Sequence, residues 1–125
     1  MRVAFTSSDG RTIDRHFGQV SDFDVWEVGP AAAGFVGRVS AVTSGLDEED
    51  RTSARATAVA GCAIVYTVQI GGPAAAKLVA RRVHPMKTGV ETPIADVVSK
   101  LQEVMRGSPP PWLRKAMGGE PSEKA

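Results

Sequence analysis

The sequence predicts an α/β fold in which a five-stranded mixed sheet is flanked by helices. Residues 61–70 form a short, almost continuously apolar run rich in β-branched side chains, which is typical of a central parallel strand covered on both faces. Residues 23–42 hold two strand-like runs separated by Gly29 and Pro30, which predicts an antiparallel hairpin. Residues 94–105 carry apolar side chains at spacings of three and four, as an amphipathic helix does.

Length and composition limit the classes of function. A chain of 125 residues is one domain by size, and its net charge of +1 gives no broad basic field for nucleic acid. One cysteine, Cys62, excludes an intramolecular disulfide framework and a cage built of cysteines alone. The chain turns polar at residues 6–9 and has no apolar run near the ~18 residues of a membrane helix, so we expect a cytoplasmic protein that does not contact a membrane.

The first elements are a strand, a loop and the hairpin. Residues 3–5 predict a short buried strand that ends in a turn-forming cluster at residues 6–10, next to the carboxyl end of the central strand. Residues 12–18 are mostly polar and are expected to form a loop over the strand ends. Residues 23–28 and 35–42 are the two hairpin strands, although the apolar alternation of the first is imperfect.

A helix is predicted before the central strand. Four acids at residues 47–50 suit a helix N-terminus, and the helix is expected to run to residue 60. Its apolar stripe is expected to include Ala54, Ala58 and Val59. This alanine-rich helix can pack close to the sheet.

The central strand leads directly into a glycine turn and a second helix. Gly71 and Gly72 allow a sharp turn, and Pro73 suits the first helical position because it lacks an N–H group. The helix is expected to reach residue 82, with Ala74, Leu78 and Val79 at helical spacing. Its free N–H groups lie where an α/β sheet binds ligands, so an anionic ligand fits there, and the alternative is a simple connecting turn.

The last third of the chain predicts an edge strand, a helix and an arm. Residues 83–88 form the edge strand, since Pro85 cannot donate to a ladder. Pro93 begins the final helix. Residues 1–107 are expected to form the binding domain and residues 108–125 a mobile Pro-rich arm, in which Trp112 and Leu113 can dock.

Three side chains are candidates for metal or cofactor ligands. His16 lies in a loop beside Gly18, so it is either a metal ligand or a solvated histidine. Cys62 is either a soft thiolate ligand or a small hydrophobe, and its place at the entrance of a buried strand favours the hydrophobe. His84 before Pro85 ranks last.

Several kinds of enzyme are disfavoured by the motifs. Two-metal chemistry needs clustered carboxylates, whereas both central strands lack acids and the aspartates are dispersed. Neither a G-x-S-x-G nucleophile motif nor a phosphate-binding P-loop is present. We therefore expect a protein that is not an enzyme.

Segments spread over nearly the whole chain resemble one family in the same order. They read Met-Arg-Val-Ala-Phe-Thr-Ser-Ser-Asp at residues 1–9, Asp-Arg-His-Phe-Gly at 14–18, Phe-Asp-Val at 23–25, Gly-Cys-Ala-Ile-Val-Tyr at 61–66, the glycine turn with its alanine helix, and Pro-Pro-Pro-Trp-Leu-Arg-Lys at 109–115. Together they resemble the dinitrogenase iron–molybdenum cofactor biosynthesis family. The resemblance implies a ribonuclease H-like three-layer fold and a small carrier of an iron–sulfur precursor of the cofactor. It implies as partners the nitrogenase cofactor scaffold protein and the cluster-synthesising radical-SAM enzyme.

The resemblance also selects site residues. The family's His-Phe-Gly motif falls on His16, Phe17 and Gly18, which makes His16 the expected cluster ligand, and Cys62 matches a cysteine common in similar chains. We expect the anionic pocket to be shaped by two pairs of small residues, which are Ser7, Ser8, Gly71 and Gly72.

One alternative belongs to another class of function. In it, the protein is a ligand-independent interaction module whose arm docks a partner through Trp112 and Leu113. Deleting residues 108–125 is expected to separate the two, because a carrier without the arm still binds cluster.

Overall fold

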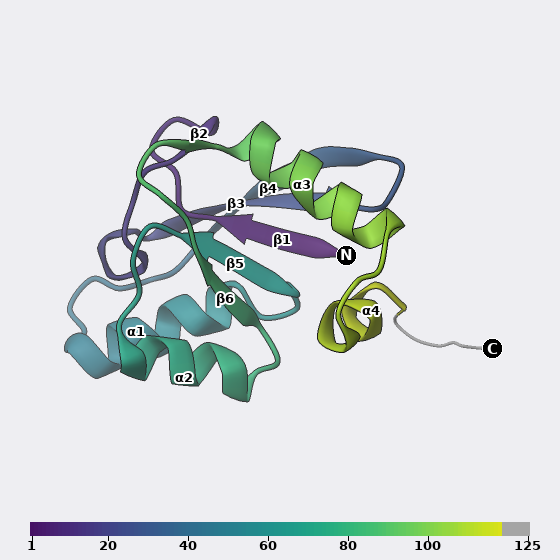
Figure 1. Ribbon diagram of the computed structural model, residues 1–125. Helices are drawn as coiled ribbons and strands as arrows, with labels where there is room; N and C mark the ends of the chain where they lie inside the picture. The colour runs from purple at the N-terminus through teal and green to yellow at the C-terminus, as the bar shows by residue number, and fades with distance from the viewer. Residues whose placement is uncertain (119–125) are drawn as a thin grey trace.

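The central layer of the molecule is a five-stranded mixed sheet (Figure 1). The computed structural model describes residues 1–118. In spatial order the strands are β4 (Ala33–Ser40), β3 (Asp22–Val28), β1 (Arg2–Phe5), β5 (Ile64–Thr67) and β6 (His84–Lys87). Strand β1 is antiparallel to β3 and parallel to β5, β3 is antiparallel to β4, and β5 is parallel to β6. This confirms the predicted α/β class and the ribonuclease H-like arrangement.

Helices cover both faces of the sheet. Helices α1 (Glu48–Ala58) and α2 (Gly72–Ala80) pack on one face, and α3 (Ile94–Arg106) and α4 (Pro111–Gly118) lie on the other side (Figure 1). Each face has its own buried cluster of apolar side chains. Throughout residues 1–118, every helix is too short or too polar to span a bilayer.

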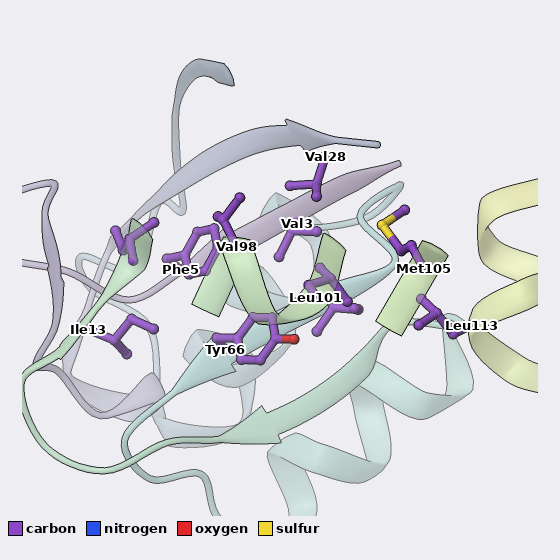
Figure 2. Close-up of a cluster of buried hydrophobic side chains, with 11 residues drawn as sticks. Val3, Phe5, Ile13, Val28, Tyr66, Val98, Leu101, Met105 and Leu113 are labelled. Atoms are coloured by element: carbon purple, nitrogen blue, oxygen red, sulfur yellow. The ribbon is translucent and has the colours of Figure 1, made fainter. Parts of the chain in front are cut away.

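The two central strands are apolar throughout because both of their faces are buried. Along β1, Val3 and Phe5 belong to the cluster beneath α3, whereas Ala4 belongs to the cluster beneath α1 and α2. Strand β5 divides in the same way, with Tyr66 stacked on Phe5 at 5.5 Å between ring centroids (Figure 2). The prediction of a doubly covered central strand is confirmed.

The structure of the β3–β4 hairpin explains why the apolar residues of β3 do not alternate regularly with polar ones. Phe23 and Val25 of β3 face α1 and α2, whereas Trp26 and Val28 face α3, so both sides of the strand carry apolar residues. The ladder with β4 also shifts register between Val25 and Trp26.

A second, two-stranded sheet stands where the sequence predicts a loop. Strand β2 (Thr12–Ile13) pairs with β7 (Thr92–Pro93), and a 3₁₀ helix follows at Phe17–Gln19. The N–H of Ile94 donates to the carbonyl of Arg11 at 2.8 Å. The two-residue strand was not predictable from local pattern, because its partner lies far away in the sequence.

The predicted helices form, with some differences in their faces and ends. In α3 the predicted stripe is confirmed, with Ile94, Val98, Leu101 and Met105 buried. In α1 the buried residues are Arg55, whose Nε donates to the carbonyl of Val20 at 2.7 Å, and Ala56. Of the predicted stripe, Ala54 and Ala58 are half-buried, and Val59, just beyond the helix, is fully buried.

Helix α2 begins and ends earlier than predicted. It starts at Gly72, with Gly71 as its N-cap, and ends at Ala80 because Arg82 has a φ of 62°, which a right-handed helix cannot contain. Val79, predicted to lie on the apolar face, is 60% exposed, whereas Leu78 is fully buried.

Residues 111–118 differ from the mobile arm that the sequence predicts. They form helix α4, and Leu113 is only 2% exposed because it packs into the cluster beneath α3 (Figure 2). Its neighbour Trp112 stacks on His84 with ring centroids 3.9 Å apart. The rest of the predicted arm, residues 119–125, lies outside the described residues.

Candidate functional site

The loop that carries His16 is pinned to the carboxyl ends of β1 and β5. The Arg15 carbonyl lies within hydrogen-bond distance of the Thr6 Oγ1 at 2.8 Å, the Thr67 Oγ1 at 3.1 Å and the Val68 N–H at 3.1 Å. Both threonines are fully buried, and their hydroxyls are 3.1 Å apart. Three donors around one carbonyl fix the backbone immediately before His16.

The residue after His16 is fixed as firmly. The Phe17 N–H donates to the carbonyl of Gln69 at 2.9 Å, and the Phe17 ring is buried against Phe23 at 5.5 Å. His16 itself is exposed, with extended backbone angles. The structure therefore presents this imidazole to solvent from a backbone that is held on both sides.

The Ser7 and Ser8 side chains fold the preceding loop. The Ser7 Oγ accepts the Gly10 N–H at 2.9 Å, while the N–H and the hydroxyl of Ser8 both donate to the carboxylate of Asp14. Asp9 accepts two backbone N–H groups, from Arg11 and Thr12, and these hydrogen bonds lower the pKa of its carboxyl group. Both serine hydroxyls thus have partners inside the loop.

Two hollows flank the His16 loop. The larger, of about 820 Å³, lies between the loop, the start of α1 and the side of α2, and it brings together Phe17, Gly18 and Gly71. The smaller, of about 230 Å³, is lined by Ser7 and Ser8 from the other side of the loop. The predicted site residues are thus not joined in one hollow, and His16 and Gly72 line neither of the two.

Glycine is not required at the predicted turn by backbone conformation. Gly71 has a φ of −76°, and neither Gly71 nor Gly72 has a positive φ. A Cβ placed on Gly18 or on Gly72 would meet nothing within 4 Å. These glycines leave open space beside the larger hollow, although Gly72 does not line it.

Cys62 lies at the opposite end of β5. It precedes the strand, whereas the His16 loop is hydrogen-bonded to Thr67 and Val68 at the carboxyl end, and the strand Ile64–Thr67 alone spans roughly 10 Å at about 3.3 Å per residue. Burial raises the pKa of the Cys62 thiol, which disfavours the thiolate needed for metal binding. The structure therefore does not bring His16 and Cys62 together.

The other predicted ligand, His84, is also remote from His16. It lies in the edge strand β6, stacked on Trp112. Within residues 1–118, no three histidine, cysteine or carboxylate side chains gather as a metal site does. Of the three predicted metal ligands, His16 is the one whose side chain is exposed, since Cys62 is buried and His84 is half-buried.

Sequence reasoning missed the residues that support this loop. Thr6 and Thr67 each stand at the carboxyl end of a buried strand, where a polar residue was a usable signal. Two basic residues, Arg15 and Arg38, line the smaller hollow and are 23 positions apart in the sequence. No local pattern in the sequence indicates that they lie together.

Comparison with known proteins finds a family that matches most of the chain. Residues 1–104 match the family described as dinitrogenase iron-molybdenum cofactor. The chain belongs to this family. The match includes the His16 loop, both central strands and the glycine turn, and it ends before α4.

The relatives agree with this membership. The chain is 41% identical to protein NifX of Herbaspirillum seropedicae over 120 residues, covering 94% of this chain and 82% of that one. It is 36% identical to protein NifY of Azotobacter vinelandii, covering 99% of this chain but only 51% of that one. A solved structure described as the crystal structure of PH0822 matches with a TM-score of 0.59 at 24% identity, covering 82% of this chain and 91% of that one, which shows a common fold.

Proposed function

We propose that this protein acts in the biosynthesis of the iron–molybdenum cofactor of nitrogenase as a carrier without catalytic activity of its own. Its cargo is an iron–sulfur precursor of the cofactor, received from the cluster-synthesising radical-SAM enzyme and handed to the scaffold protein. Membership of the dinitrogenase iron-molybdenum cofactor family and the similarity to NifX support this assignment.

The observation that carries the proposal is the presentation of His16. Its backbone is fixed on both sides by hydrogen bonds to strand ends, its side chain is exposed, and the two residues that follow it, Phe17 and Gly18, line the larger hollow. A neutral imidazole is a good ligand for iron. In the carrier, His16 binds one iron of the cluster, and the hollow at Gly18 and Gly71 receives part of its bulk.

A single protein ligand suits transfer. Most irons of such a cluster are capped by its own sulfides, so few protein ligands are needed and release is easy. We expect a dissociation constant of about 1 μM, which is a binding free energy of about 8 kcal/mol. Much tighter binding would slow delivery, because affinity differences lie mostly in the dissociation rate.

Delivery is the experiment that tests the carrier role. The protein is loaded anaerobically with the precursor, mixed with cluster-free scaffold protein and separated by gel filtration, and iron is measured in both fractions. We expect iron to move to the scaffold within the mixing time. Iron that stays with the loaded protein, even with excess scaffold, would contradict a carrier.

A second candidate function is an interaction module, and an apolar groove between α3, β6 and α4 favours it. The groove is lined by Met86, Val104 and Trp112 among others, with Val104 42% exposed. Deleting residues 108–125 no longer separates the two functions cleanly, because it also removes the buried Leu113.

A point variant in the groove separates them instead. Val104→Lys puts a charge in the groove without touching the His16 loop. If the protein is a carrier, the variant still loads cluster and still delivers it. If it is a ligand-independent module, wild type binds no cluster and the variant loses its complex with the scaffold protein.

A further inference from the structure

We propose that the smaller hollow beside the His16 loop binds a small oxyanion, through the guanidinium groups of Arg15 and Arg38. The hollow has a volume of about 230 Å³, and all of its lining residues except Val20 are polar or charged. This site is separate from the cluster ligand and does not depend on the carrier function.

Arg38 is held in place by a buried carboxylate. Its Nε donates to the Asp24 Oδ1 at 2.9 Å, and Asp24 is only 2% exposed. This hydrogen bond raises the pKa of Arg38, which keeps the guanidinium charged. Within residues 1–118 the hydrogen bonding of Arg38 uses Nε alone, so both terminal nitrogens are left for a ligand.

Arg15 reaches the hollow from a second fixed segment. Its carbonyl is the one held by Thr6, Thr67 and Val68, so its Cα has little freedom. Among residues 1–118 its guanidinium has no hydrogen-bond partner and no ion pair, and both arginines line the same hollow. Both arginines thus line one small hollow, and each has guanidinium N–H groups without a partner among the described residues.

Charge and donors select the class of ligand. The lining holds two arginines and one carboxylate, that of Asp22, whose Oδ1 accepts the hydroxyl of Ser40, and the buried Asp24 offsets the charge of Arg38. The ligand is therefore selected by the unused N–H groups of the two guanidiniums, which favour an acceptor with several oxygen atoms, such as an oxyanion. The planar guanidinium fork matches paired oxygens of a carboxylate or a phosphate-like ion. Gln19 and Ser21 add polar groups at the rim.

Titration of the full chain without any cluster tests this proposal. Calorimetry at constant ionic strength, with inorganic phosphate in one series and citrate in another, distinguishes a tetrahedral ion from a carboxylate. We expect saturable binding of at least one probe. In Arg15→Gln the affinity falls about tenfold, because charge-assisted hydrogen bonds are lost while nothing buried is left unpaired.

Two control variants show whether a loss of oxyanion binding is specific to the proposed site. Arg11→Gln removes an exposed arginine from the same loop outside the hollow, and it is expected to bind as wild type does. His16→Gln is also expected to keep oxyanion binding, so failure of the carrier function and failure of this site are separable. No saturable binding of either probe, or equal losses in Arg11→Gln and Arg15→Gln, would overturn the proposal.

Discussion

At the scale of single residues, the Arg15 carbonyl determines how His16 is presented. Its partners, Thr6 and Thr67, are polar residues with no exposed surface at the ends of adjacent parallel strands. A buried hydroxyl group destabilises the folded protein unless it is hydrogen-bonded. The Arg15 carbonyl therefore stabilises both buried threonines, and their hydroxyl groups hold the loop in place. The sheet and the His16 loop are therefore coupled through two hydroxyl groups.

Thr67→Val is expected to loosen this coupling. The substitution keeps the shape of the side chain but removes the hydroxyl, and the Arg15 carbonyl loses one of its donors. We expect the protein to lose about 1–2 kcal/mol of its free energy of unfolding in urea, and the Phe17 amide to exchange faster with solvent.

Thr12→Val is the matched control, because its hydroxyl has no hydrogen-bond partner within residues 1–118. Its unfolding free energy and its Phe17 exchange rate are expected to stay close to wild type. Equal protection of Phe17 in both variants would show that the threonine pair does not hold the loop.

His16 could be identified from the sequence as a candidate ligand, whereas the two threonines that hold its loop could not. His16, Phe17 and Gly18 could be selected because they form a motif. Thr6 and Thr67 are 61 positions apart, and only the parallel pairing of β1 and β5 brings them together. The same reason explains why the sequence grouped Ser7 and Ser8 with Gly71 and Gly72, whereas the structure places these pairs at different hollows or outside them.

At the scale of elements, helix α4 is part of the folded core rather than an appendage. Leu113 packs with Tyr66, Leu101 and Met105, which come from β5 and α3 (Figure 2). The segment lies beyond residue 104, where the family match ends, although the alignment with NifX of Herbaspirillum seropedicae covers 94% of this chain. Helix α4 thus adds Leu113 to the cluster beneath α3.

Leu113→Ala is expected to show this contribution. Truncating a buried leucine removes packed methyl groups and leaves a cavity, which costs about 2–5 kcal/mol of unfolding free energy. Lys115→Ala, an exposed change in the same helix, is the control and is expected to cost little. Chemical denaturation measures both, and a cost for Leu113→Ala no greater than that of the control would mean that α4 is not docked in solution.

Elements differ in how far the sequence predicts them. Helix α3 is readable because its apolar side chains recur at helical spacing over thirteen residues. Strand β2 has two residues and α4 begins at the last of three consecutive prolines, so neither carries enough local pattern. Both form because of partners elsewhere in the chain, namely β7 for the strand and the α3 cluster for the helix.

At the scale of the whole molecule, one sheet separates two cores, and Tyr66 is in the core beneath α3. Burial raises the pKa of Tyr66 to about 12, from about 10 in an unfolded chain. Between these values the unfolded chain has lost the phenol proton while the native protein keeps it. The unfolded state then binds fewer protons, so stability falls as pH rises.

We therefore expect this group to lower the unfolding free energy by up to about 3 kcal/mol as the pH rises, with most of the loss between pH 10 and 12 and little of it below pH 10. Tyr66→Phe removes the group and is expected to flatten that part of the curve. Because the chain has one tyrosine, phenolate absorbance reports the native pKa directly. A native pKa near 10 would contradict the prediction.

The central claim is that His16 binds the iron–sulfur cargo, and the two histidines of the chain allow a direct test. Wild type, His16→Gln and His84→Gln are each titrated anaerobically with the iron–sulfur precursor, and cluster absorption is measured in the protein peak after gel filtration. We predict that wild type and His84→Gln retain cluster and that His16→Gln loses it. Cluster retained by His16→Gln as well as by wild type would contradict the account.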